Sequence, residues 1–200
     1  ITVPLNRGDV YCIKSRFAGE GGSLTGSLVT ADKPVAVFSG GESGWIPGVA
    51  TPTTGFLNPH AEQMIPVEFL GTEYAAMPFR SRSGGDTYKI VATQPSTTVA
   101  LLGSTMFLQN PGDWQEVNFT TARKLSADKP IIVAQFANSA RWDSDTAEYG
   151  DGSMLLLVPL DRHFSCHYFP AGMLLADPVL EPDPAVFLDV DDSLTIPATP

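Results

Sequence analysis

The sequence predicts an all-β protein, a tandem or fused β-sandwich built from two related antiparallel units. Short runs rich in β-branched and aromatic residues are separated by turn residues along the chain, which is the pattern of a β-sandwich. The 17 prolines leave few uninterrupted windows for a long helix, and no segment carries a sustained helical period. At 200 residues and 43% hydrophobic composition, the chain can form one large β domain or two small ones.

The clearest predicted strands combine β-forming residues with flanking turn residues. Several prolines lie at the edges of these runs, Pro34 and Pro130 among them, where a missing N–H group costs least. The predicted strands are residues 10–14, 27–30, 35–39, 88–93, 98–102, 115–119, 131–136 and 154–158.

An internal repetition supports the two-unit architecture. Residues 28–38 recur 96 positions later as residues 124–134, and both copies contain Ala-Asp-Lys-Pro directly before an apolar run. We expect the Asp to close an Asx turn and the Pro to fix φ where the apolar run enters the core.

A second repetition pairs residues 63–67 with residues 156–160, at an offset of 93. Because the two offsets are similar, duplication is the favoured explanation. The predicted organisation is a first β-sandwich unit over residues 1–97, a second related unit over residues 98–185, and a C-terminal strand with an acidic tail over residues 186–200.

The dipeptide Gly-Asp recurs before predicted strands, at Gly8, Gly85 and, more loosely, Gly112. This pattern indicates a turn that leads into a strand. The first copy is preceded by Arg7 and spells the tripeptide that integrins recognise, but the other copies lack the Arg. The turn explains all three copies, so we prefer it to an adhesion motif.

Net charge argues against a nucleic-acid partner. The chain has 12 basic and 22 acidic residues, a formal net charge of −10, and such a charge repels a phosphate backbone. The longest dense apolar run, residues 154–160, is far shorter than the roughly 18–20 residues of a membrane span. The chain starts at Ile1 without an initiator Met or a signal peptide, which suggests a processed or excised segment.

Cofactor candidates are few. Cys12 and Cys166 form no CxxC pair; they form one long-range disulfide if the chain is secreted, or remain buried thiols. Asp143, Asp145 and Asp151 make an oxygen-rich loop that is a weak calcium candidate, because the loop departs from the EF-hand template at its fifth, sixth and twelfth positions. A plain loop between two strands is the favoured interpretation, and no other cofactor is expected.

Trp45 and Trp142 are the best candidates for a binding face. Both lie in Gly- and Asp-rich loops just after the two repeated core strands, and loops on a rigid scaffold commonly carry recognition. No catalytic signature stands out, since residues 39–44 lack the spacing of a nucleophile elbow. Glu62, Glu68 and Glu73 are candidates for the two carboxylates that a glycoside hydrolase needs.

An ordered series of segments resembles the IgGFc-binding protein N-terminal domain family. The series comprises residues 24–40, His60, residues 62–67, 85–92, 97–99, 127–130 and 151–154. It spans roughly residues 5–170 and implies a non-catalytic extracellular module of large secreted or cell-surface proteins. Fc binding is not carried over, because the chain is strongly acidic and lacks the Cys-rich repeats that accompany the domain in a mucus protein.

These observations predict a secreted or cell-surface module that binds or adheres to a protein or glycan through its loops. The candidate binding residues are Trp45, His60, Glu62 and Trp142. The alternative is a structural subunit of an extracellular fibre or sheath, which assembles with other copies of itself by strand exchange through residues 186–196. A surface glycan hydrolase is the third hypothesis.

Overall fold

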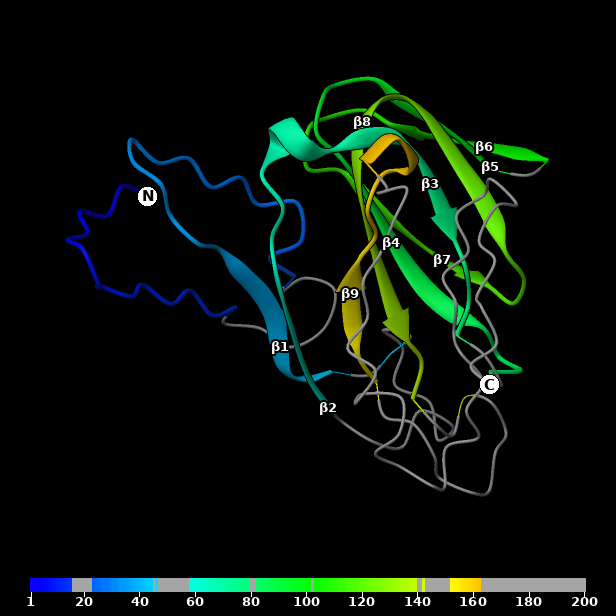
Figure 1. Cartoon of the computed structure of the whole chain (residues 1–200), viewed down its shortest axis with the longest axis horizontal. Coiled ribbons are helices and arrows are strands. Elements are labelled where there is room, and N and C mark those ends of the chain that lie inside the picture. The colour runs from blue at the N-terminus through cyan, green and yellow to red at the C-terminus, as the bar shows by residue number, and fades with distance from the viewer. Residues whose placement is uncertain are drawn as a thin grey trace, which may run out of the picture.

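The computed structural model describes residues 1–15, 23–44, 46, 58–79, 82–101, 103–139, 142 and 152–162. Within these residues the regular elements are almost entirely β-strands (Figure 1). The elements are β1 (Phe38–Gly44), β2 (Asn58–Gln63), η2 (Val67–Phe69), β3 (Gly71–Ala76), β4 (Asp86–Ala92), β5 (Thr97–Leu101), β6 (Ser104–Leu108), β7 (Trp114–Phe119), β8 (Arg123–Ala137), β9 (Met154–Leu156) and η4 (Leu160–Arg162).

The strands form two antiparallel sheets, which confirms the predicted all-β, sandwich-like class. A seven-stranded sheet has the order β6-β5-β8-β4-β7, and β3 and β9 also pair with β8. A separate two-stranded sheet consists of β1 and β2. The seven-stranded sheet curls around its longest strand, β8 (Figure 1).

β8 organises the large sheet because it changes partners along its 15 residues. Its first part pairs with β3 and β5, and its second part pairs with β4 and β9. The change falls at residues 128–130, where Pro130 has no N–H to offer to a ladder. The second Ala-Asp-Lys-Pro copy therefore lies within one continuous strand. The expected turn between two strands at this place is wrong.

The main hydrophobic core lies on one face of β4 and β8. Its fully buried members include Tyr74, Tyr88, Leu125 and Ile131. The Tyr74 hydroxyl donates to the Ile131 carbonyl (2.6 Å) and accepts from the Gly71 N–H (3.1 Å). This bonding satisfies a buried phenol that is otherwise costly to desolvate.

A smaller apolar cluster lies on the opposite face of β8. Ile46, Ala134 and Phe136 form its buried part, and Met154 and Leu156 pack against it. Successive side chains of a strand point to opposite faces, so the residues of β8 that alternate with the main core supply this second cluster. β8 is consequently covered on both faces over its second half.

All three Gly-Asp dipeptides form turns, as predicted. Gly8, Gly85 and Gly112 have φ values of +90°, +69° and +86°, which glycine adopts far more readily than other residues. β4 begins at Asp86 directly after the second turn, and β7 begins at Trp114 after the third. Arg7 and Asp9 lie in the first turn. Among the described residues, no strand directly follows this turn.

Several predicted strands need correction. Residues 10–14 and 27–30 are not in strands, and the strand expected at 35–39 is β1, which starts only at Phe38. No strand of the described residues pairs with these segments, and an isolated extended chain gains little from its backbone groups. Sequence patterns also missed β2, β3 and β6, because β2 and β3 are rich in polar and small residues and carry no clear alternation.

The division expected at residue 97 coincides with the start of β5, in the middle of the seven-stranded sheet. Strands from both sides of this residue share one sheet, since β3 and β4 pair with β8. The division into two related β units stays a prediction. Residues 186–200 lie outside the described part of the chain.

Candidate functional site

The loops that follow β1 and β8 meet at one end of the molecule. β1 and β8 both run toward the lower edge in Figure 1. After β8, the Ser139 N–H donates to the carbonyl of Ile46 (3.0 Å), and the Trp142 N–H donates to the carbonyl of Ser139 (2.8 Å). The two loops after the repeated strands are thus hydrogen-bonded to each other.

A third loop joins them at the start of β4. The indole Nε1–H of Trp142 donates to the carbonyl of Gly84 (3.3 Å), and Trp142 itself is half-buried. We call the surface formed by the partly exposed Arg82, Gly84 and Trp142 the loop face, and the buried Ile46 and Ser139 lie beneath it. Three segments that are distant in sequence contribute to the loop face and to the layer beneath it.

Asn138 supports the loop face from below. This fully buried residue donates through Nδ2 to the Gly85 carbonyl (2.7 Å), and its Oδ1 accepts from the Thr87 hydroxyl (2.6 Å). The Asn138 carbonyl accepts from the Arg82 guanidinium. A buried amide with these partners holds the loops in one arrangement, because losing a partner leaves a desolvated polar group.

A second buried polar pair lies beside Asn138. The Asp86 carboxylate accepts from the Phe79 N–H (2.7 Å) and from Gln135 Nε2 (2.7 Å). Gln135 Nε2 also donates to the carbonyl of Met77 (2.8 Å). The pair fixes the chain before β4 against the end of β8.

Sequence patterns did not identify these buried polar residues as part of the site. One signal was available, since Gln135 and Asn138 interrupt or end an otherwise apolar run. A polar residue in a buried strand needs a partner, but the sequence does not say which one.

Burial, and secondly the charge of the Asp86 carboxylate, raise the pKa of Tyr88 well above its ordinary value. The Tyr88 hydroxyl is buried without a hydrogen-bond partner in the described structure. The phenol therefore stays neutral in the folded protein. It contributes packing to the main core and carries no charge there.

His60 and Glu62 lie on β2, two residues apart on the same face of the strand. The His60 ring packs edge-to-face on Phe136, with 5.7 Å between ring centroids and an interplanar angle of 88°. Because Phe136 shares a cluster with Ile46, His60 connects to the loop face through packed side chains. Glu62 is half-buried and lies opposite Ser39 in the β1–β2 ladder.

Other candidate residues lie partly or wholly outside the described structure. Cys12 is exposed, and Cys166 is among the residues that are not described, so the disulfide stays a prediction. Trp45 and the calcium candidates Asp143, Asp145 and Asp151 are also among the residues that are not described, so their predicted roles stay predictions. Among the described residues, no three His, Cys, Asp or Glu side chains gather in a way that could hold a metal ion.

The described part of the chain also has no helix with the length and hydropathy of a membrane span. No curated protein and no solved structure matches the chain. A family model described as IgGFc binding protein matches residues 1–172, most of the chain. With its antiparallel sheets and an ordered series of motifs that extends through this range, the chain belongs to the IgGFc-binding protein family.

Proposed function

We propose that this chain is a non-catalytic extracellular binding module that contacts a protein ligand through the loop face. The observation that carries the proposal is the joining of three loops by the bonds from Ser139 to Ile46, Trp142 to Gly84 and Arg82 to Asn138. Membership of a family named for binding supports the functional class. Secretion or display at the cell surface is part of the same proposal.

Preorganised loops suit recognition for a thermodynamic reason. Ordering a flexible loop on binding costs free energy, and a loop that is already fixed avoids this cost. Buried hydrogen bonds of Asn138 and Asp86 fix the loops before any ligand arrives. Trp142 then offers a large, rigid side chain, the residue type most enriched at interface hot spots.

The test uses the full chain and defined probes. Immobilised chain is exposed to an IgG Fc fragment and to a panel of secreted glycoproteins, each before and after enzymatic deglycosylation. We expect at least one probe to bind, and Trp142→Ala to weaken that binding by about tenfold or more. A ligand that is lost on deglycosylation favours a glycan partner over a protein partner.

Phe107→Ala provides the matched control, since Phe107 is a 59% exposed aromatic residue on the edge strand β6. If Phe107→Ala and Trp142→Ala weaken ligand binding equally, the result contradicts the proposal that the ligand contacts the loop face. Melting curves of both variants separate lost binding from lost folding.

The outer edge of β6, with which no strand in the described ranges pairs, favours a second candidate function, a fibre or sheath subunit. β6 ends the order β6-β5-β8-β4-β7, and an unpaired edge can accept a strand from a neighbouring molecule. In this alternative, residues 186–196 of one copy pair with another copy. Polymers seen by light scattering and negative-stain microscopy that vanish when residues 186–200 are deleted support it, and a monomer throughout excludes it.

A further inference from the structure

We propose that Asn118 is an N-glycosylation site, which carries an oligosaccharide at one edge of the seven-stranded sheet. Asn118-Phe119-Thr120 is the only Asn-x-Ser/Thr sequence of the chain, and its middle residue is not proline. This pattern is the acceptor for N-linked glycans in secreted proteins. The inference rests on the proposed extracellular location, and it does not depend on what the loop face binds.

The acceptor sequence lies at the end of β7 and at the start of the connection to β8. Asn118 and Phe119 are the last residues of β7, and Thr120 follows them before β8 begins at Arg123. Asn118 and Thr120 are both exposed, whereas Phe119 is half-buried and packs against the main core. The two polar side chains that the modification requires are thus accessible, and the residue between them anchors the end of the strand.

Alternation along β7 places Asn118 on the face opposite the main core. Val117 lies opposite the core residue Tyr88 in the β4–β7 ladder, and Asn118 lies opposite Thr87. Successive side chains of a strand point to opposite faces, so Asn118 shares a face with Thr87 and, one strand further, with Phe136. An oligosaccharide on Asn118 therefore projects from the sheet without entering the main core.

The Asn118 side chain has no hydrogen bond to lose. Among the described residues, no group forms a hydrogen bond with its amide, whereas the amide of the fully buried Asn138 bonds through both its oxygen and its nitrogen. The side-chain nitrogens of Asn6 and Asn110 each donate to an aspartate of their own turn. Modification of Asn118 consequently removes no hydrogen bond from the described fold.

The modification is a group transfer to the side-chain nitrogen. A bond forms between Asn118 Nδ2 and the anomeric carbon of an oligosaccharide that a lipid-linked sugar diphosphate donates, and the bond from that carbon to the phosphate oxygen breaks. The lipid diphosphate leaves, and the nitrogen loses one proton. The hydroxyl of Thr120 is the second group that the acceptor pattern requires.

Asn118 lies beside the strand ends from which the loop face extends. Asp86, the first residue of β4, pairs with Phe119 of β7 on one side and with Ala137 of β8 on the other. The loop face is built from the segments directly before β4 and directly after β8. A glycan on Asn118 therefore flanks the loop face and restricts the approach of a ligand from the side of β7.

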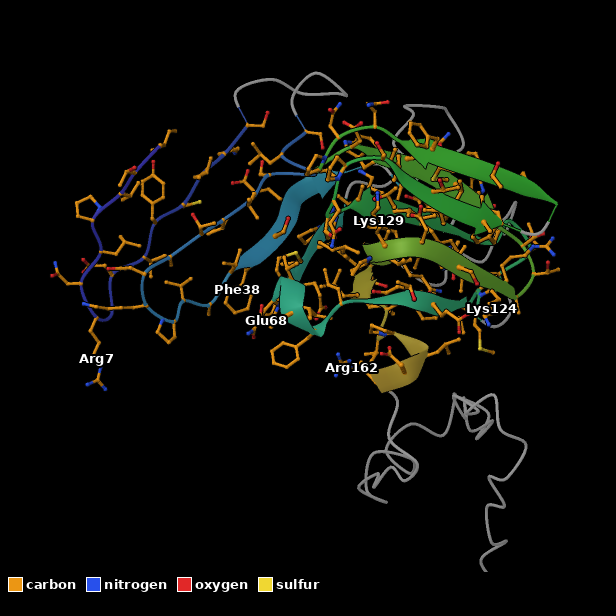
Figure 2. The ribbon with its side chains drawn as sticks, turned by 90° about the horizontal axis from the view of Figure 1, so that it is seen from above. Arg7, Phe38, Glu68, Lys124, Lys129 and Arg162 are labelled. Carbon is orange, nitrogen blue, oxygen red and sulfur yellow. The ribbon has the colours of Figure 1, made fainter. Side chains whose placement is uncertain are left out.

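The N-terminal region lies away from the glycosylation site. Figure 2 shows Lys124, which lies at the start of β8 just after the β7–β8 connection, at the opposite end of the molecule from Arg7. In Figure 1 the N-terminal region likewise projects away from the seven-stranded sheet. The glycan and the outer end of the N-terminal region therefore occupy different ends of the molecule.

A glycan on β7 also protects an edge of the sheet. Among the described residues β7 pairs with β4 alone, so its outer edge presents unpaired backbone groups. Such edges accept strands from other molecules, and natural proteins commonly obstruct them. A bulky, hydrated oligosaccharide on Asn118 hinders this pairing at β7, whereas β6, at the other end of the strand order, carries no acceptor sequence.

The experiment produces the full chain behind a cleavable secretion signal in animal cells that N-glycosylate secreted proteins. We expect a glycan on the secreted chain, seen as a mass that falls to that of the polypeptide after treatment with a peptide N-glycosidase. Asn118→Gln and Thr120→Ala should both lose the glycan, and Thr120→Ser should keep it, because serine restores the hydroxyl. Asn110→Gln is the matched control and should stay glycosylated, since Asn110 is exposed like Asn118 but begins no acceptor sequence.

A secreted, folded chain whose Asn118 is unmodified overturns the proposal, and so does a glycan that persists in Asn118→Gln. The glycosylated chain should melt no lower than the same chain produced in bacteria without the glycan, because the site is exposed and has no hydrogen bond to lose. A lower melting temperature would show that the folded sheet has no room for the glycan, and it would also overturn the proposal.

Light scattering at equal concentration compares the glycosylated chain with Asn118→Gln from the same cells. The variant should associate more, and equal association contradicts the protection of β7. The added signal brings every variant into the secretory pathway, so an unmodified Asn118 reflects the site and not the natural location of the chain. Ligand binding to the loop face is measured separately on unglycosylated chain, so the failure of one proposal is distinguishable from the failure of the other.

Discussion

Residues 28–38 and 124–134 share the Ala-Asp-Lys-Pro sequence, yet only the second segment lies wholly within a strand. Residues 124–134 belong to β8, whereas residues 28–37 are outside any ladder of the described residues. The core-facing Ile131 is fully buried in the second copy, and the corresponding Val35 is 54% exposed in the first.

The second copy differs because its polar residues have partners. Asp128 Oδ1 accepts from the Thr98 N–H (2.8 Å), and Lys129 Nζ donates to the carbonyls of Pro95 (2.6 Å) and Ser96 (2.8 Å). Ser96 has a φ of +54°, which few non-glycine residues adopt. The motif therefore fastens the β4–β5 connection to β8. In the described part of the chain, nothing plays the role of β5 for residues 31–34.

The largest expected difference between the copies concerns their apolar side chains. Ile131→Ala should lower the free energy of unfolding by about 2–5 kcal/mol, because it leaves a cavity in the main core. Val35→Ala, at the corresponding position, should change it by less than about 0.5 kcal/mol. Urea unfolding followed by circular dichroism measures both. A cost for Val35→Ala near that of Ile131→Ala would mean that the first copy is packed in solution.

Alkaline pH should weaken the core around the second copy. Burial is the largest cause that raises the pKa of both Tyr74 and Tyr88. Below pH 10 both phenols are protonated in the folded and the unfolded chain, so their full contribution to stability is present. Above pH 10 the unfolded chain loses these protons first, so stability falls by up to about 1.4 kcal/mol per pH unit for each tyrosine.

Urea unfolding at intervals between pH 8 and pH 11 tests this dependence. Tyr88→Phe should reduce the slope above pH 10, because one of the two titrating groups is removed. A stability that stays constant up to pH 11 would show that neither phenol is protected in the folded state.

Replacing the two tyrosines separates packing from hydrogen bonding. Tyr74→Phe should cost about 1–2 kcal/mol, because the Ile131 carbonyl and the Gly71 N–H lose their partner. Tyr88→Phe should leave stability at pH 7 unchanged or raise it, because the Tyr88 hydroxyl is buried without a partner. Thermal unfolding of the two variants side by side measures the difference, and equal losses would contradict the assigned bonding.

The smallest expected effect concerns the lysines of the two motif copies. Lys129→Met should lower the free energy of unfolding by about 1 kcal/mol, since two carbonyls lose a charged donor near the surface. Lys33→Met should have no measurable effect, because Lys33 is exposed. The melting temperatures of the two variants measure these effects. An equal fall in melting temperature for Lys33→Met would contradict the expected difference between the two lysines.

Much of the sheet could be predicted from local patterns. β4, β5, β7 and the second half of β8 fall close to predicted strands, because their β-forming runs are long and bounded by turn residues. The Gly-Asp turns were predicted for the same local reason, since a positive φ favours glycine. β2 and β3 escaped prediction, because their polar and small residues form strands only where a neighbouring strand supplies the ladder.

The candidate site was also predictable only in part from the sequence. Sequence alone marked Trp142 as a loop residue after a core strand, and its place in the repetition suggested a shared face with the segment that contains Ile46. The bonds of Trp142 to Gly84 and of Asn138 to Gly85 join residues more than 50 positions apart. No local pattern encodes such partners.

The sequence by itself determined the all-β class, the turns and the family, because these depend on side-chain type and short-range spacing. Only the tertiary structure decided which Ala-Asp-Lys-Pro copy becomes a strand and which apolar residues become core. The physical reason is that a strand needs partners on its edges and cover on its faces, and long-range contacts supply both. β8 has neighbours on both edges, whereas no ladder of the described residues includes residues 28–37.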